Sequence, residues 1–237
     1  MNWKISGMNG MIKFLLFLLL SITSFLFAEE MNVYTELNRF PTSEGFTRFD
    51  FVYKITYNNL TFLPKQDSFE AFLDVSIKIM KESSLVKEVN FSTPFNEVNK
   101  DVTLSQYEYM MDKISLTFST QGYSIIIEFS DRHSGNNKIW EQDFELLSQK
   151  FSISDLEFSS EVIEVDAEIK NKFLRGNNLF YVNPSHIFDP DETENLFIYF
   201  EAGVVDSSSV SGYIADLKID CENEIVSEDS FVLSKLA

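Results

Sequence analysis

The sequence predicts an all-β protein of short strands, arranged as a β-sandwich or a β-barrel. Three observations carry this prediction. Apolar and polar residues alternate along many short segments, which is the period of a strand and not of a helix. Turn-forming residues separate these segments. Aromatic residues make up 15% of the chain, and most of them are Phe, which suits the half-buried surface of a sheet.

The alternation is clearest in the first half of the chain. Within residues 48–57 the apolar side chains fall on one face, while Arg48, Asp50, Lys54 and Thr56 fall on the other. A helix with this spacing would distribute its apolar groups around the whole cylinder, so a strand is the better interpretation. The apolar members of the predicted strands are, in chain order, Phe49, Phe51, Tyr53, Ile55, Tyr57; Ala71, Leu73, Val75, Ile77, Ile79; Ile114, Leu116, Phe118; Tyr123, Ile125, Ile127, Phe129; and Trp140, Phe144, Leu146.

Turn residues fit this division into strands. Residues 131–137, DRHSGNN, lie between two alternating segments and predict a hairpin, because Asp, Gly and Asn favour tight-turn geometry. Residues 101–113 are ambiguous. Leu104, Tyr107 and Met111 have helical spacing there although strands surround them, so a short helix or an irregular crossing is the alternative to a strand.

The strand pattern divides the mature chain into two parts. Residues 29–156 form the first predicted β-sandwich domain. The alternation weakens in the charged segment 157–178, which we interpret as a linker. It returns in residues 179–237, which are far fewer than the roughly 100 that a β-sandwich of the immunoglobulin type takes. The second domain is therefore predicted to be incomplete, either because a partner completes it or because the chain is a fragment of a longer gene product.

The first 28 residues have the pattern of a secretory signal peptide. Lys4 and Lys13 precede an apolar run that begins at Phe14 and ends at Ala28, and two acidic residues follow it. The run is shorter than the roughly 20 residues of a membrane-spanning helix. We therefore expect an exported protein in the periplasm, at the cell envelope or outside the cell, with no transmembrane segment in the mature chain.

The charge of the chain excludes several classes of partner. The formal net charge is −18, and removal of the signal peptide takes away two lysines and no acid. Nucleic acids and anionic lipid surfaces bind clustered Lys and Arg, so we do not expect this protein to bind DNA, RNA or a membrane surface. Solubility is the simplest reason for such a charge, and a surface for cations or for a basic partner is the alternative.

The chain offers few of the residues that catalysis or metal binding uses. Its single cysteine, Cys221, excludes an internal disulfide and is expected to be buried on a strand. The two histidines, His133 and His186, do not have the spacing of zinc ligands. The sequence contains no GxSxG motif and no phosphate-binding glycine loop. These features favour a protein that is not an enzyme and that needs no cofactor.

One acidic segment is a candidate metal site. Residues 189–194, DPDETE, place several carboxylates in a predicted loop, and Ca²⁺ binds close-set oxygen ligands. The segment lacks the glycine and the ligand register of an EF-hand, and a solvated turn is the simpler interpretation. The candidate ligands are Asp189, Asp191, Glu192 and Glu194.

Some aromatic residues are expected outside the core. Alternating aromatic residues usually fill the core of a sandwich. Phe72, with Trp140 or Phe62, falls on the predicted outer face. If these side chains are exposed together, they form an apolar patch, and such patches mark binding surfaces.

Several short segments together resemble the N-terminal part of the bacterial GWxTD-domain proteins, over about residue 31 to the end. The family's Gly-Trp-x-Thr-Asp motif lies further toward the C-terminus in those proteins and is absent from this sequence. The resemblance implies an exported bacterial protein with tandem immunoglobulin-like β-sandwiches, and it implies no biochemical activity. The similar segments are residues 46–49 with 57–62, 71–79, 122–135, 151–156 (FSISDL), 183–185 (NPS) and 198–201 (IYFE).

The resulting hypothesis is a non-enzymatic interaction or structural module in the periplasm or cell envelope. An unpaired sheet edge can accept a strand from an envelope protein or from a second copy of the chain. Two alternatives remain open. One is a carbohydrate-binding accessory module, since sandwich domains often accompany enzymes that act on sugars. The other is an N-terminal fragment of a longer GWxTD-type protein.

Overall fold

The computed structural model describes residues 31–233 except 43, 45, 120, 121, 148–150, 167, 190, 192–194, 205–212, 222 and 223. The predicted signal peptide, residues 1–28, lies outside this part of the chain.

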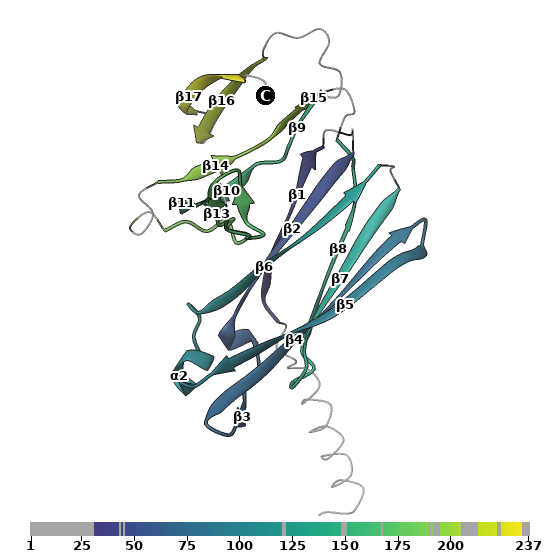
Figure 1. Ribbon diagram of the computed structural model, residues 1–237, viewed down its shortest axis with the longest axis vertical. Coiled ribbons are helices and arrows are strands. Elements are labelled where there is room, and N and C mark those ends of the chain that lie inside the picture. The colour runs from purple at the N-terminus through teal and green to yellow at the C-terminus, as the bar shows by residue number, and fades with distance from the viewer. Residues whose placement is uncertain are drawn as a thin grey trace, which may run out of the picture.

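The protein is almost entirely β-structure, as the alternation predicts (Figure 1). In the described residues, two short helical segments interrupt the strands, and neither is long and apolar enough to cross a membrane. The elements are β1 (Val33–Pro41), β2 (Thr47–Thr56), η1 (Tyr57–Asn59), β3 (Leu63–Lys65), β4 (Ser68–Lys81), β5 (Ser84–Glu97), α2 (Lys100–Thr103), β6 (Tyr109–Phe118), β7 (Tyr123–Asp131), β8 (Asn137–Asp143), β9 (Phe151–Ile153), β10 (Glu157–Ser159), β11 (Val162–Glu164), β12 (Leu174–Arg175), β13 (Asn178–Phe180), β14 (Phe197–Tyr199), β15 (Ala202–Val204), β16 (Tyr213–Cys221) and β17 (Glu224–Leu233).

Strands β1 to β8 form a first unit of two packed antiparallel sheets. One sheet has the order β1-β2-β6. In the other, β4 pairs with β5 along one edge and with β7 and the short β3 along the other, and β8 pairs with β7. The chain therefore changes sheet between β2 and β3, between β5 and β6 and between β6 and β7. This is a β-sandwich; its immunoglobulin-like character stays a prediction.

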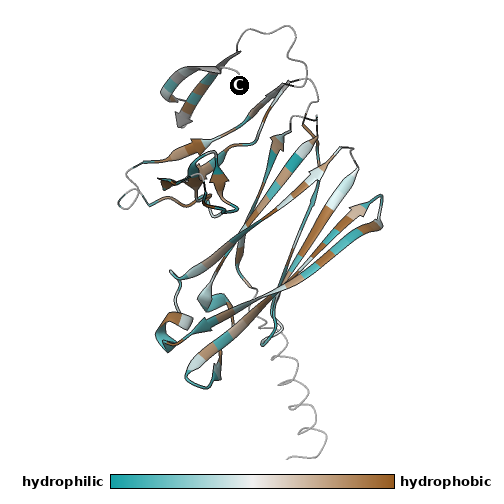
Figure 2. Ribbon diagram, viewed as in Figure 1, coloured by the Kyte–Doolittle hydropathy of each residue, from teal (hydrophilic) through white to brown (hydrophobic). Residues whose placement is uncertain are grey.

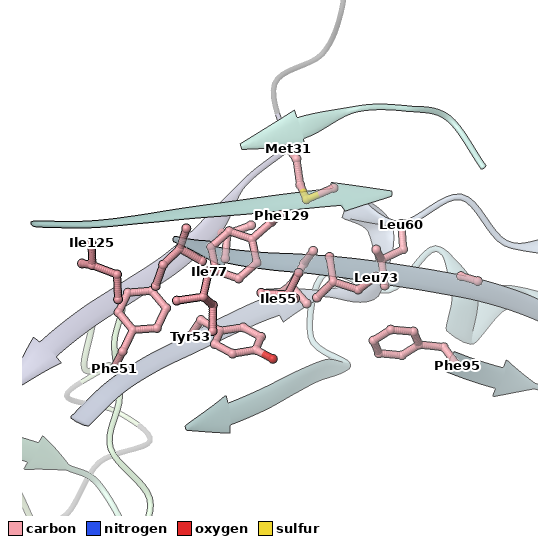
Figure 3. Close-up of a cluster of buried hydrophobic side chains, with 14 of the residues drawn as sticks. Met31, Phe51, Tyr53, Ile55, Leu60, Leu73, Ile77, Phe95, Ile125 and Phe129 are labelled. Carbon is pink, nitrogen blue, oxygen red and sulfur yellow. The ribbon is translucent and has the colours of Figure 1, made fainter. Parts of the chain in front are cut away.

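The core of the first unit lies between the two sheets. Phe51, Tyr53 and Ile55 point inward from β2 and pack in one cluster with Ile125 and Phe129 of β7 (Figure 3). Hydrophobic and hydrophilic residues alternate along these strands, as Figure 2 shows. Burial of each large apolar side chain contributes about 1.5–3 kcal/mol, so this cluster dominates the stability of the unit.

Neighbouring residues explain the structure of the ambiguous segment 101–113 and of the turn between β4 and β5. Residues 101–113 contain the end of one helical turn, α2, whose N-terminus Asn99 caps. Leu104 and Tyr107 follow this turn and Met111 lies in β6, so their helical spacing forms no helix. The tight turn between β4 and β5 consists of Glu82 and Ser83 with φ angles of 48° and 68°. Both angles are positive, as a two-residue turn needs when its twist matches that of the strands.

The expectation of an outer aromatic patch is wrong for two of its three residues. Trp140 packs against the core and lies 4.8 Å from the ring of Phe51, and Phe62 also packs against the core, where its ring meets Phe95. Phe72 lies apart from them, in contact with His133 and Arg132 of the hairpin that follows β7. Phe62 lies in the short connection between η1 and β3, where alternation along a strand does not predict the direction of a side chain.

Strands β9 to β15 form a second unit of smaller sheets, and β16 and β17 form a hairpin that pairs with no other described strand. The pairs are β9 with β15, β10 with β14 and β16 with β17, and β13 lies between β11 and β12. The segment predicted as a linker, residues 157–178, contains β10, β11 and β12. The second unit covers the outer face of the β1-β2-β6 sheet, where Val52 packs with Phe173, Phe180 and Val182.

Candidate functional site at the junction of the two units

A buried carboxylate, Asp50, lies at the centre of the junction. It points outward from β2, on the face opposite the sandwich core, yet its side chain is only 1% exposed because the second unit covers it. One carboxylate oxygen accepts a hydrogen bond from Ser115 at 2.7 Å. The other lies 3.4 Å from Nζ of Lys113 and 3.0 Å from Nη2 of Arg175. Nε of Arg48 lies 3.3 Å from the same oxygen that accepts the Ser115 hydrogen bond.

Arg175 of the second unit completes this buried charge network. It donates two hydrogen bonds to Glu157, at 2.6 and 2.8 Å, and Glu157 is fully buried. Its guanidinium also lies over the rings of Phe40 and Tyr199, at 5.0 and 5.2 Å from their centroids. A bidentate guanidinium between two aromatic rings has little freedom to rotate. Arg175 therefore fixes the position of β12 on the first unit.

The junction network, defined as Asp50, Lys113, Glu157 and Arg175, balances two acids with two bases. Burial alone would raise the pKa of Asp50, but the cations and the Ser115 hydroxyl around it hold that pKa below its ordinary value. Burial lowers the pKa of Lys113 despite the nearby Asp50. For Glu157, burial raises the pKa although Arg175 opposes that rise. Buried ion pairs of this kind add little net stability, but the loss of one member is costly.

A second link joins Arg39 of β1 to Asp155, between β9 and β10. The Asp155 carboxylate accepts three hydrogen bonds from Arg39, each of 2.8 Å, one of them from the main-chain N–H. In return, the Asp155 N–H donates to the Arg39 carbonyl at 3.0 Å. Neighbouring Ser154 exchanges hydrogen bonds with the main chain of Glu201, each 2.8 Å long. Asp155 of the FSISDL segment therefore joins the two units, while Ser154 connects two segments of the second unit.

A third link joins Glu36 of β1 to His186. Nε2 of His186 lies 3.1 Å from a Glu36 carboxylate that is 8% exposed, and Asn38 donates to the other oxygen at 2.7 Å. His186 adopts a positive φ of 52° in the turn that begins at Asn183. The Asn183 side chain accepts hydrogen bonds from Ser185, so the NPS segment shapes the turn that presents His186.

A groove of about 480 Å³ opens beside the junction. Its first-unit wall is the start of β6, and its second-unit wall is the loop before β12 together with Tyr181. Lys172 of that loop bonds to both carboxylate oxygens of Asp112, at 2.6 and 2.9 Å. The lining residues are Tyr109, Met111, Asp112, Lys170, Asn171, Lys172, Phe173 and Tyr181.

The predicted Ca²⁺ ligands are only partly visible. Asp189 accepts a hydrogen bond from the main-chain N–H of Asp191 at 2.9 Å, which closes a local turn. Glu192 and Glu194 lie outside the described residues. Within the residues that the structure describes, no group of three or more His, Cys, Asp or Glu side chains is placed to hold a metal ion. The Ca²⁺ hypothesis therefore stays a prediction.

The DRHSG hairpin brings an acid, a histidine and a serine together without forming a catalytic triad. Asp131 is fully buried and accepts hydrogen bonds from Ser134 and from the main chain of Thr61 and His133. The His133 ring bonds to the Thr61 carbonyl at 2.9 Å instead of to Ser134. Asp131 thus organises the turn. Cys221 lies at the end of β16, as a strand residue.

Reasoning from sequence missed the junction network. Asp50 and Lys113 fall on the polar face of their strands, which predicts solvent exposure. Glu157 and Arg175 lie within the charged segment that reads as a linker. The sequence contains one signal of this burial, because Val52 lies on the same face of the strand as Asp50, opposite the core. An apolar residue on an otherwise polar face indicates that another part of the protein covers that face.

Comparison with known proteins leaves these residues as the basis for any functional conclusion. No family model matches the sequence, and no curated protein matches it.

Proposed function

We propose that the protein is an exported, non-enzymatic β-sandwich module that binds a protein partner in the periplasm or at the cell envelope. The observation that carries this proposal is the junction network, in which the second unit neutralises charges on the outer face of the first. Buried ion pairs tolerate few alternative geometries, since each displaced charge would be left without a partner. A chain that holds two units in one arrangement is suited to presenting a composite surface to a partner.

The sheet edges of the first unit are the natural places for such a partner. Strands β5, β6 and β8 each pair on one side only, among the described residues. The β5 edge carries a bulge at Val86, a lysine at position 87 and Pro94, all of which oppose pairing with another strand. The β6 edge lies next to the groove of the junction and has no proline.

Site-specific photo-crosslinking tests the proposal. The full chain, including residues 1–28, is produced in a bacterium with a photoreactive amino acid at Tyr109 of β6 or, separately, at Tyr107 near α2. Tyr107 is the matched control because it is 90% exposed and is not among the residues that line the groove. We expect a discrete adduct with an envelope protein from position 109 and none from 107. A chain that stays monomeric and forms no adduct at either position would contradict the proposal.

Export is tested separately. Residues 1–28, fused to alkaline phosphatase without its own leader, should give active phosphatase, because that enzyme needs the oxidising periplasm for its disulfides. The same fusion with Leu18 and Leu19 replaced by Arg is the control and should be inactive, since it interrupts the apolar run. Activity from both fusions, or from neither, would argue against the predicted signal peptide.

A carbohydrate-binding module is the second candidate. A hollow of about 350 Å³ lies on the outer face of β4, β5 and β7, lined mainly by hydroxyl, amide and carboxylate side chains that can bond to sugar hydroxyls. A glycan array would separate the two candidates, and retention of a specific glycan that is lost in Asn90→Ala would favour this one. Its lining residues are Asp74, Val75, Ser76, Asn90, Phe91, Ser92, Glu128 and Ser130.

A further inference from the structure

The groove at the junction has an apolar floor between two walls from different units. Tyr109 and Met111 face it from β6, while Phe173 and Tyr181 face it from the second unit, with ring centroids 6.0 Å apart. Phe173 is 7% exposed and also packs against Lys113 of the junction network. The floor is therefore fixed by the same contacts that hold the units together.

Two lysines beside this floor lack an acidic partner. Lys54 lies over the ring of Tyr109, with Nζ 4.1 Å from the centroid, and Lys170 lines the opposite wall. In the described part of the chain, no acid forms an ion pair with either of them, whereas Lys172 is held by Asp112. Burial lowers the pKa of Lys54.

These lysines are notable because of the composition of the chain. Acidic residues number 37 against 19 lysines and arginines. Most of the surface therefore repels an anionic ligand, while this groove offers one unneutralised positive charge on each side of an apolar floor. The complementary ligand carries negative charge next to apolar side chains.

The adjoining strand edge indicates the kind of ligand. β6 pairs with β2 along one side and with no other described strand. The main-chain N–H and C=O groups of its outer edge can therefore bond to the main chain of an extended peptide. In an extended peptide, successive side chains point to opposite faces, so acidic and apolar residues in alternation would reach different parts of the groove.

We propose that this groove binds an extended acidic peptide segment, with carboxylates toward Lys54 and Lys170 and an aromatic or aliphatic side chain on the floor formed by Tyr109, Met111 and Phe173. This inference rests on the proposed function and names the surface and the partner chemistry that serve it. A second copy of this acidic chain is the alternative occupant of the groove.

Fluorescence anisotropy with a labelled peptide tests this assignment. The probe is the heptapeptide SEFEVES carrying fluorescein, and the matched probe SQFQVQS has the same shape without the charges. We expect SEFEVES to bind the full chain more tightly than SQFQVQS, and to bind less tightly as salt is raised, because salt screens exposed charges. Equal binding of the two probes, or no binding of SEFEVES, would overturn the proposal.

Charge reversals locate the binding surface. Lys54→Glu and Lys170→Glu should each weaken SEFEVES binding about threefold to tenfold, and the double variant should weaken it further. Lys87→Glu on β5 reverses the charge of a lysine that is exposed like Lys170; it is the control and should leave binding unchanged. Circular dichroism melts show whether each variant folds, and Lys170→Gln repeats the test with a milder change. An equal loss in Lys87→Glu would overturn the assignment of the groove.

Two further outcomes separate this inference from the proposed function. If the chain forms a dimer that Lys170→Glu dissolves in sedimentation experiments, a second copy occupies the groove and the peptide proposal fails. If position 109 crosslinks to an envelope protein while SEFEVES does not bind, the proposed function stands and the peptide chemistry fails. If SEFEVES binds but no envelope protein crosslinks, the groove assignment stands and the proposed function fails.

Discussion

Arg175 bonds to both carboxylate oxygens of Glu157, at 2.6 and 2.8 Å, and the same guanidinium reaches Asp50 of the first unit at 3.0 Å. One side chain therefore neutralises an acid in each unit. The removal of Arg175 would leave two buried carboxylates with fewer partners, while the removal of an acid would leave Arg175 with excess charge. The arrangement makes the junction sensitive to single substitutions.

Arg175→Met should destabilise the protein by about 3–5 kcal/mol, because it leaves Glu157 as a buried charge without its principal partner. Urea unfolding followed by circular dichroism measures the change. The combined variant Arg175→Met with Glu157→Leu should recover part of the loss, since it removes both charges. Lys218→Met, which breaks an ion pair that is about half exposed on β16, is the control and should have little effect. A loss in the control as large as in Arg175→Met would contradict the special role of the buried network.

Asp131→Asn should remove part of the pH dependence of stability. Burial alone would raise the pKa of Asp131, but the hydrogen bonds that it accepts hold it below 3.8, its ordinary value. Such a group stabilises the fold above its ordinary pKa, and this stabilisation is lost as pH falls through its lower folded pKa. The wild-type protein should therefore be more stable than Asp131→Asn at pH 6, and the two unfolding free energies should converge toward pH 2. A difference that stays constant over this range would show that the charge of Asp131 is unimportant.

Glu36→Gln should have the opposite pH dependence. Burial is the main cause that raises the pKa of Glu36 above 4.5, although Asn38 and His186 oppose the rise. A raised pKa means that Glu36 contributes stability below 4.5 that is lost as pH rises through its folded pKa. The variant should therefore gain stability relative to wild type as pH rises through that range, and the gain should level off above it. Thermal melts in a pH series from 4 to 8 measure the difference. A difference that falls with rising pH would mean that the His186 pair outweighs burial.

Gly203→Ala should destabilise the contact between β15 and the end of β1. A Cβ atom at this position would lie 2.4 Å from Cβ and 2.7 Å from Cγ of Pro41, closer than atoms can pack. Overpacking of this kind costs about 1–3 kcal/mol. In a double-mutant cycle, Pro41→Gly should reduce the cost of Gly203→Ala because it removes both clashing atoms. Gly135→Ala is a poor control because of its positive φ, so Ser227→Ala on β17 serves instead. Independent, additive effects at positions 41 and 203 would rule out the clash.

The sequence predicts the first unit better than the second, for a physical reason. In β2, β4 and β7 each apolar face is satisfied by the opposing sheet of the same unit, so the period of two appears directly in the residues. Strands β10 to β13 are only two or three residues long, too short to display a period. Their burial depends on the outer face of β2, which lies more than 100 residues earlier in the chain. Local pattern therefore identifies Phe51 as core and cannot identify Glu157.

The same reasoning explains the errors at individual residues. Phe62, between η1 and β3, and Trp140, on the edge strand β8, both pack against the core, and this packing depends on the three-dimensional course of the chain. The polarity of Asp50 predicts exposure, and its burial is tolerable because Lys113, Ser115 and Arg175 surround it. By contrast, the turn residues of the DRHSG hairpin act locally, and Asp131, Ser134 and Gly135 can be assigned to a turn from the sequence.

The Arg39–Asp155 link spans 116 residues of chain. During synthesis, β1 emerges long before the segment that covers its edge, and contacts between such distant residues form slowly. Until Asp155 arrives, the main chain at Arg39 is an open strand edge that can pair with a neighbouring nascent chain. We therefore expect a stage of folding in which the first unit is formed and the edge of β1 is still exposed. The rate at which the Arg39–Asp155 contact forms, more than the stability of the core, would determine how much of the protein is lost to aggregation.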